Sequence, residues 1–173
     1  MTGRHHIVSG AVVGLCLSAS LIISGRVEIG VAGAFATTVL GSIFPDIDTS
    51  TSKLGKKMKF TSRLMNMLFG HRGFLHSPIF AVLSMILLNW LFAKYNIEQY
   101  NYIWQGFGIG ILNHLMCDMM TKGGIPLLYP FYKWKFSFSN MKSGSKLEFI
   151  PLLIVCSLSI VLTILFVCGG TFL

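Results

Sequence analysis

The sequence predicts an all-α integral membrane protein, a single domain over residues 1–173 built as a helical bundle with about five transmembrane helices. Hydrophobic residues make up 53% of the 173 residues, while Asp, Glu, Lys and Arg make up only 12%. A soluble domain carries about 25% charged residues, so roughly half of the usual charge is missing. The mean hydropathy of +0.69 is too high for a soluble fold to cover its surface with polar groups. The composition also excludes a disordered chain, a collagen and a disulfide-rich secreted module.

Five apolar segments approach the length of about 20 residues that a helix needs to cross the hydrocarbon core. The first follows a basic residue but has no convincing cleavage site, which predicts an uncleaved span. The second is rich in small residues, which let helix backbones approach closely, so we expect it inside the bundle. The fifth is uniformly aliphatic and is expected to face lipid. The predicted spans cover residues 7–24, 28–44, 78–95, 102–120 and 149–168.

The distribution of Lys and Arg predicts the orientation of the chain. Of the 14 basic residues, 12 lie in the leader and in two long loops, residues 45–77 and 121–148, while only Arg26 and Lys94 lie in the short connections. Because positive residues favour the cytoplasmic side, the N-terminus and both long loops are predicted to be cytoplasmic. This topology accounts for the net charge of +8, so no nucleic-acid partner is expected.

His and Asp residues gather at the predicted cytoplasmic ends of the first four spans. Ionisable groups at membrane depth are costly and indicate function, and the topology that brings these together rests on Lys and Arg alone. His114 and Asp118 are four residues apart and share one helix face. In an extended segment, Asp46 and Asp48 would point to the same side. The predicted metal ligands are His6, Asp46, Asp48, His71, His76, His114 and Asp118, with His5 as an alternative to His6.

These residue types suit a divalent metal, because His nitrogen and carboxylate oxygen together bind zinc, manganese or iron. One ion rarely takes more than four protein ligands, so four His and three Asp predict two ions that share a carboxylate. Structural interpretations also exist: His114 and Asp118 could form a buried polar pair, and the two other Asp could belong to a turn after Pro45. Only a metal site explains why all of them meet at one face.

The segment 53–69 alternates basic and apolar residues. Two interpretations remain open for it: a helix lying on the anionic cytoplasmic surface, and a solvated basic loop.

Four motifs follow one another along the chain: His6-Ile-Val-Ser-Gly10, Phe44-Pro-Asp46-Ile-Asp48-Thr49, Gly70-His71-Arg72-Gly73-Phe-Leu-His76-Ser77 and His114-Leu-Met-Cys-Asp118. Together they resemble the YdjM-like family of bacterial inner-membrane proteins, which are described as metal-dependent hydrolases and often named as LexA-regulated. The resemblance extends from the leader to about Pro130 and favours His6 over His5. It implies a location in the bacterial inner membrane. Through a distant similarity to zinc-dependent phospholipase C, it also implies zinc and a phosphoester substrate.

These features predict a membrane-bound, metal-dependent hydrolase with a two-metal site at the cytoplasmic leaflet. A bound metal lowers the pKa of water to about 7 and so supplies a nucleophile for attack on a phosphoester or lipid-like ester. The predicted catalytic residues are Asp48, as a ligand or base, and Arg72 and Lys122, which adjoin predicted ligands and would neutralise a phosphate. The expected partners are the lipid bilayer and a phospholipid or other phosphoester.

Two alternatives use the same residues. The first is a metal-ion transporter or metal-binding sensor, although transporter sites usually lie near the bilayer midplane. The second is a structural membrane protein whose His and Asp only form hydrogen bonds.

Overall fold

The computed structural model describes residues 1–25, 29–49, 59–69, 73–132 and 134–170. Within these ranges the chain is all-α, as predicted, and contains no strand beyond a single bridge between Ile125 and Phe136. The six α-helices are α1 (Gly3–Ile23), α2 (Ile29–Ile43), α4 (Lys59–Phe69), α5 (Pro78–Lys94), α6 (Asn101–Met119) and α7 (Phe149–Gly170). Short 3₁₀ helices connect them: η1 (Phe44–Asp48), η2 (Phe74–His76), η3 (Glu98–Tyr100) and η4 (Lys146–Glu148).

All five predicted apolar segments form helices close to their predicted bounds. In the described part of the chain, three helical segments are long and apolar enough to cross a membrane: Gly3–Ile23, Gly30–Asp48 and Lys146–Cys168. The helix α5 is apolar but has only 17 residues. The helix α6 has 19 residues, and polar side chains such as Asn113 and His114 lower its hydropathy.

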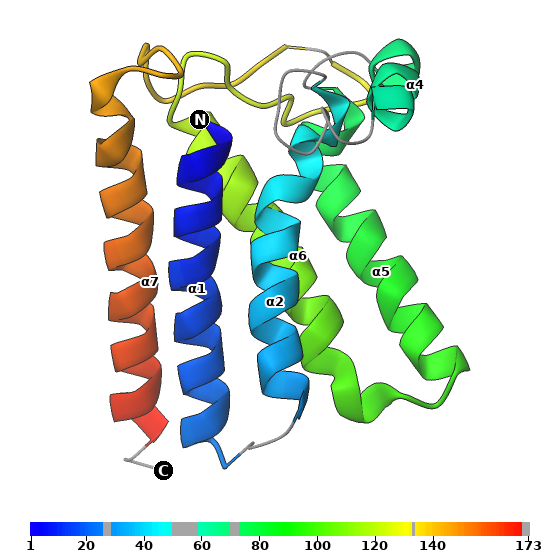
Figure 1. Ribbon diagram of the computed structural model, residues 1–173, viewed down its shortest axis with the longest axis vertical. Helices are drawn as coiled ribbons and strands as arrows, with labels where there is room; N and C mark the ends of the chain where they lie inside the picture. The colour runs from blue at the N-terminus through cyan, green and yellow to red at the C-terminus, as the bar shows by residue number, and fades with distance from the viewer. Residues whose placement is uncertain (26–28, 50–58, 70–72, 133, 171–173) are drawn as a thin grey trace.

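The long helices lie side by side, and α2 occupies the interior of the bundle. Figure 1 shows α1 between α7 and α2, with the N-terminus, α4 and the segment after α6 at one end of the molecule. The helix α2 packs against α1 and, most extensively, against α6. In the most apolar 18-residue stretch of Gly30–Asp48, which contains most of α2, 44% of the residues are buried. In the corresponding stretch of Lys146–Cys168, which contains most of α7, only 11% are buried. The small-residue prediction for the second segment is therefore confirmed.

Glycines make the close approach of α2 and α6 possible. A Cβ atom at Gly41 would lie 2.2 Å from the carbonyl oxygen of Phe107, and one at Gly110 would lie 2.2 Å from that of Thr38. Real Cβ atoms do not approach backbone oxygens so closely, so both positions require glycine. The contact brings the C-terminal end of α2, including Ser42, against the second half of α6.

The segment that follows α2 is a 3₁₀ helix, so the expectation of an extended Pro45–Asp48 was wrong. Pro45 lies in the first turn of η1, where its fixed φ favours a helix, and the Thr49 N–H donates to the Asp46 carbonyl oxygen at 3.1 Å. With three residues per turn, residues two apart point in directions about 240° apart around the axis. Asp46 and Asp48 therefore do not share a side by alternation, and Asp48 is the more deeply buried of the two.

Of the two interpretations of residues 53–69, a helix is confirmed over Lys59–Phe69, whereas residues 53–58 lie outside the described part of the chain. Phe60 and Met67 of α4 are 82% and 79% exposed. Asn66 holds the helix against η1 by donating its side-chain N–H to the Asp48 carbonyl oxygen at 3.2 Å. The exposed apolar side chains next to Lys59 and Arg63 are typical of a helix lying at a membrane surface.

The contact between α2 and α6 yields a test of packing. We expect Gly41→Leu to destabilise the protein by on the order of 1–3 kcal/mol or more, because the larger side chain forces the two helices apart. Thermal unfolding in detergent measures the effect. The matched control is Ala36→Leu, which adds similar bulk to an exposed position on the same helix. Equal unfolding temperatures for the two variants would contradict the close approach.

Candidate metal centre

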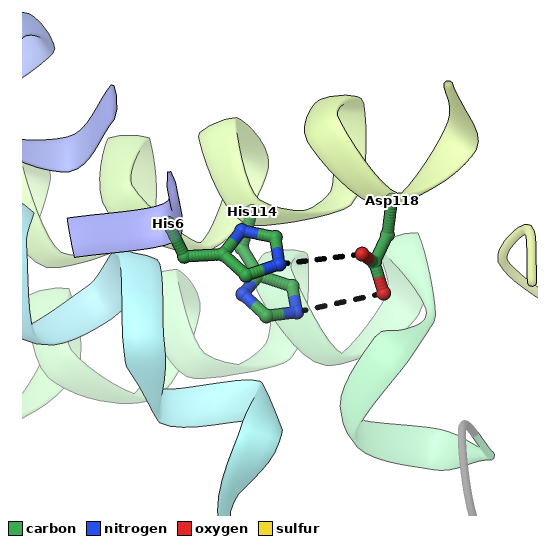
Figure 2. A group of neighbouring side chains, drawn as sticks. All are labelled: His6, His114 and Asp118. Atoms are coloured by element: carbon green, nitrogen blue, oxygen red, sulfur yellow. Dashed lines mark ion pairs between the residues drawn. The ribbon is translucent and has the colours of Figure 1, made fainter. Parts of the chain in front are cut away.

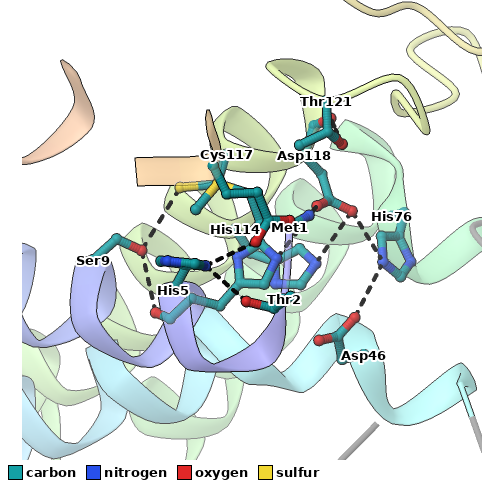
Figure 3. A network of polar contacts seen from close by, with 12 residues as sticks. Met1, Thr2, His5, Ser9, Asp46, His76, His114, Cys117, Asp118 and Thr121 are labelled. Atoms are coloured by element: carbon teal, nitrogen blue, oxygen red, sulfur yellow. Dashed lines mark hydrogen bonds and ion pairs between the residues drawn. The ribbon is translucent and has the colours of Figure 1, made fainter. Parts of the chain in front are cut away.

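Four elements bring His and Asp side chains together at the end of the bundle that carries the N-terminus. His6 comes from the first turns of α1, Asp46 from η1, His76 from η2, and His114 and Asp118 from the second half of α6. Figure 3 shows Asp46, His76, His114 and Asp118 of this cluster facing one another. The side chains of the three His and of Asp118 are at most 1% exposed. A cluster of this kind inside an apolar bundle must satisfy its polar atoms internally.

The first group of potential ligands comprises His6, His114 and Asp118. Their ligand atoms all lie within 4.8 Å of one another. The Nε2 atom of His6 is 3.3 Å from Asp118 Oδ1, and that of His114 is 3.9 Å from Asp118 Oδ2. The two imidazole rings stack with centroids 3.8 Å apart, and both direct a nitrogen at the carboxylate (Figure 2).

A backbone contact selects the tautomer of His114. Its Nδ1 atom lies 2.7 Å from the carbonyl oxygen of Ser42. A carbonyl oxygen can only accept, so Nδ1 carries the proton and the Nε2 lone pair is directed into the cluster. This is the usual orientation of a metal-binding histidine, whose second nitrogen donates to a carbonyl or carboxylate.

The second group comprises Asp46, His76 and His114, again with ligand atoms within 4.8 Å of one another. The Nε2 atom of His76 lies 3.9 Å from Asp46 Oδ1 and 3.8 Å from Asp118 Oδ2. Its other nitrogen, Nδ1, lies 3.3 Å from Asp48 Oδ2. Asp48 therefore contacts the far side of the His76 ring and belongs to neither group.

Local sequence explains the position of His76. It ends η2, and Ser77 then caps α5 by accepting a hydrogen bond from the Phe80 N–H at 3.3 Å. Pro78 occupies the first helical position, where its missing N–H costs nothing. Ser77 and Pro78 thus begin α5, and this helix start fixes the direction in which His76 leaves the backbone.

The structure separates the two neighbouring histidines of the leader. His6 lies inside the cluster, whereas His5 Nδ1 lies 2.8 Å from Glu148 Oε2 and 2.7 Å from Thr2 Oγ1. Glu148 is fully buried and also accepts a hydrogen bond from the Gly144 N–H at 2.9 Å. Our sequence analysis did not single out Glu148. The signal was present, because it is a lone acidic residue at the start of a strongly apolar segment.

The remaining predicted site residues are not part of the described cluster. His71 and Arg72 lie outside the described residues. Lys122 follows the buried Thr121, and its side chain is exposed. Its backbone N–H donates to the Met141 carbonyl oxygen at 2.8 Å, which ties the segment after α6 to residues further along the chain.

The chemistry of the cluster fits a divalent cation. Among the described residues, Nδ1 of His6 has no hydrogen-bond partner, and Nε2 of His6 and of His114 face the Asp118 carboxylate at 3.3 and 3.9 Å. Buried polar atoms without partners are rare and call for an explanation such as a bound ion. The α-amino group of Met1 contacts Asp118, so a positive charge is accommodated beside this carboxylate. Buried imidazole nitrogens facing carboxylate oxygens are a ligand set that can hold a metal.

The YdjM inner membrane protein family matches residues 1–171, which is nearly the whole chain. The chain belongs to the YdjM inner membrane protein family. Its family and its apolar helices make it a multi-pass protein of the inner membrane. No solved structure shows significant similarity to it.

Curated relatives of this YdjM family member come from several bacteria. The chain is 34% identical over 120 residues to the "Inner membrane protein YdjM" of Escherichia coli (strain K12) and to that of Shigella flexneri. This alignment covers 65% of the chain and only 57% of either relative. A Bacillus subtilis (strain 168) protein, YvsG, is 32% identical over 131 residues, which cover 75% of the chain and 74% of YvsG.

The separation of the two leader histidines yields a test of the metal centre. We expect His6→Ala to weaken metal binding by at least about tenfold, because it removes a buried ligand from the first group. Mass spectrometry of the protein purified in mild detergent measures the metal content. His5→Ala is the matched control and should keep its metal, since His5 contacts Glu148 instead. Retention of metal by His6→Ala would contradict the assignment.

Proposed function

We propose that this YdjM family member is a membrane-bound, metal-dependent hydrolase that acts on a phosphoester or lipid-like ester. The observation that carries this proposal is the buried cluster of five His and Asp side chains from four elements, with imidazole nitrogens facing carboxylate oxygens. A structural polar cluster would be expected to pair these nitrogens with hydrogen-bond partners of the protein. Nδ1 of His6 instead has none among the described residues, and Nε2 of His6 and of His114 face the Asp118 carboxylate.

In this proposal Asp118 would be a ligand shared by two ions. Its Oδ1 faces His6, and its Oδ2 faces His76 and His114. One ion would be held by His6, His114 and Asp118, and a second by His76, Asp46 and Asp118. His114 has only Nε2 to offer, because Nδ1 donates to Ser42, so it serves a single ion. His71 remains a proposed additional ligand.

Asp48 is proposed as a positioning residue. A carboxylate behind a ligating histidine holds the ring in place and increases its basicity, and Asp48 has this relation to Nδ1 of His76. Divalent ions at such a centre polarise an ester oxygen and activate water. Arg72 and Lys122 are proposed to bind the charged phosphate oxygens of the substrate.

The site is proposed to open at the cytoplasmic leaflet of a five-span protein. The two helices that lack the length or hydropathy of a standard span, α5 and α6, are proposed as the additional spans. Beyond α6, at the cluster end, aromatic side chains are widely exposed, with Phe131 at 84% and Trp134 at 67%. Exposed lysines such as Lys135 and Lys142 lie on the same segment. Aromatic and basic side chains together are typical of the level of lipid head groups.

Reporter fusions test the proposed topology. Fusions after Lys142 should show a cytoplasmic location, and fusions after Asn96, in the connection between α5 and α6, a periplasmic one. A fusion after Cys168 provides a second periplasmic point. The reverse pattern would place the cluster at the periplasmic leaflet and contradict the proposal.

Turnover in lipid nanodiscs tests the hydrolase itself. Metal-loaded wild type should hydrolyse a soluble phosphodiester or a phospholipid in a screen. The activity of Asp118→Asn should be at least about 100-fold lower than that of the wild type, and this variant should also lose its metal. Asp48→Asn should weaken metal affinity or activity by roughly 10–100-fold.

The matched control for these carboxylates is Glu98→Gln, which alters an exposed carboxylate in η3 and should retain full activity. Metal bound by the wild type without turnover of any ester would instead identify a metal-binding or transport protein. Absence of metal from the wild type would leave only a structural polar cluster.

A further inference from the structure

An apolar groove runs along the bundle on the other side of α6 from α2, between α1, α6 and α7. It has a volume of about 380 Å³. Side chains from all three helices line it, among them Val13, Leu17, Ile109, Leu112, Leu158 and Leu162. Leu112, Leu158 and Leu162 are 43–57% exposed, so the groove is open to the surroundings of the bundle. In a membrane those surroundings are lipid.

The hydroxyl groups in the groove do not make it polar. Ser20 donates to the Cys16 carbonyl oxygen at 3.0 Å, Ser159 to that of Val155 at 2.8 Å and Thr163 to that of Ser159 at 2.9 Å. Each hydroxyl proton is therefore used within its own helix. The wall offers methylene and methyl groups, which suit a hydrocarbon chain.

The groove has the length of one leaflet. Along α7 it extends from Val155 to Phe166, which is twelve residues, or eleven helical rises of about 1.5 Å and about 16 Å in all. Half of the hydrocarbon core of a bilayer is about 15 Å thick. Its near end, at Val13, Asn113 and Val155, lies toward the metal-centre end of the helices, as the chain directions in Figure 1 show. Along α7 the groove begins six residues after Phe149 and ends four residues before Gly170, so an acyl chain in it would begin on the metal-centre side and extend past the middle of the helix toward its far end.

The side-chain oxygen of Asn113 is a buried hydrogen-bond acceptor at the near end of the groove. Ser9 donates its hydroxyl to the His6 carbonyl oxygen at 3.2 Å and so accepts from the Asn113 side-chain N–H at 3.0 Å. This leaves Oδ1 of Asn113 as the free end of the amide, and among the described residues it has no hydrogen-bond partner. Asn113 is only 5% exposed, lines the groove and immediately precedes His114. A buried, unpaired acceptor at this position points to a ligand with a donor group.

We infer that the groove binds one acyl chain of a phospholipid that carries a hydroxyl or amide N–H donor, and that Asn113 accepts a hydrogen bond from that donor. The chain fills the space between α1, α6 and α7, while the phosphoester reaches the cluster at the groove's near end. The assignment of this lipid as a substrate rests on the proposed function. The binding of the lipid does not.

Photo-crosslinking in nanodiscs tests the binding without turnover. The probe is phosphatidylglycerol with a diazirine at the end of one acyl chain, added to metal-free protein. Label should concentrate on the far end of the groove, at Leu162 and Phe166. Ser159→Phe, which fills the groove, should reduce this labelling at least about tenfold. The matched control, Ser157→Phe, places the same bulk on an exposed position of α7 and should change nothing.

The donor is tested by a second probe and a second variant. Phosphatidylcholine with the same labelled chain has no donor, and we expect it to label the groove roughly two- to tenfold less, the range of one net hydrogen bond. Asn113→Ala should lower labelling by phosphatidylglycerol to the phosphatidylcholine level. Equal labelling of wild type and Ser159→Phe, or labelling of Ile86 and Leu87 on α5 to the same extent as the groove, would overturn the inference.

Hydrolysis of bis(p-nitrophenyl) phosphate by metal-loaded protein separates this inference from the proposed function. This soluble diester needs no groove, so Ser159→Phe should retain wild-type turnover. Groove labelling without any ester hydrolysis would support the lipid site and contradict the hydrolase. Hydrolysis with labelling that Ser159→Phe leaves unchanged would support the hydrolase and overturn the groove.

Discussion

The packing at one end of this apolar bundle is constrained by the imidazoles and carboxylates that are buried there. A buried ion without a partner costs several kcal/mol even after relaxation of its surroundings. The protein meets this cost by surrounding His76 and His114 with carboxylates and a backbone carbonyl. The Ser42 carbonyl oxygen holds one ring and Asp48 holds the other. Nε2 of His6 and of His114 then face the Asp118 carboxylate, an arrangement of nitrogen and oxygen ligands that can hold a cation.

The packing of α2 on α6 is the means by which these contacts are made. Gly41 and Gly110 let the backbones touch, and the Ser42 carbonyl oxygen then reaches His114 Nδ1. A bulkier residue at either glycine would separate the helices and remove the acceptor that selects the tautomer. Helix packing and the chemistry of the site are therefore coupled through the same few residues.

The helix α6 connects two environments. His114 and Asp118 face the cluster, whereas Ile109 and Leu112 line the apolar groove, and Asn113 lies between them. The proposed lipid substrate would match such an arrangement, because a phospholipid is hydrocarbon at one end and charged at the other. The buried Glu148 lies at the same end of the bundle, where it pairs with His5 of the leader.

The sequence by itself determined the all-α class, the bounds of five apolar helices, the interior position of α2 and the residue types of the site. Each of these follows from local composition or spacing: apolar length, the small residues of the second segment, and the spacing of His114 and Asp118. Contacts between segments far apart in the chain were decided only by the tertiary structure. In the tertiary structure, Pro45–Asp48 forms part of a 3₁₀ helix, and Asp48 contacts His76 from the side away from the cluster. His6 lies in the cluster, whereas His5 pairs with Glu148. Such choices depend on which backbone and side-chain atoms meet across helices, and no periodicity within one segment carries that information.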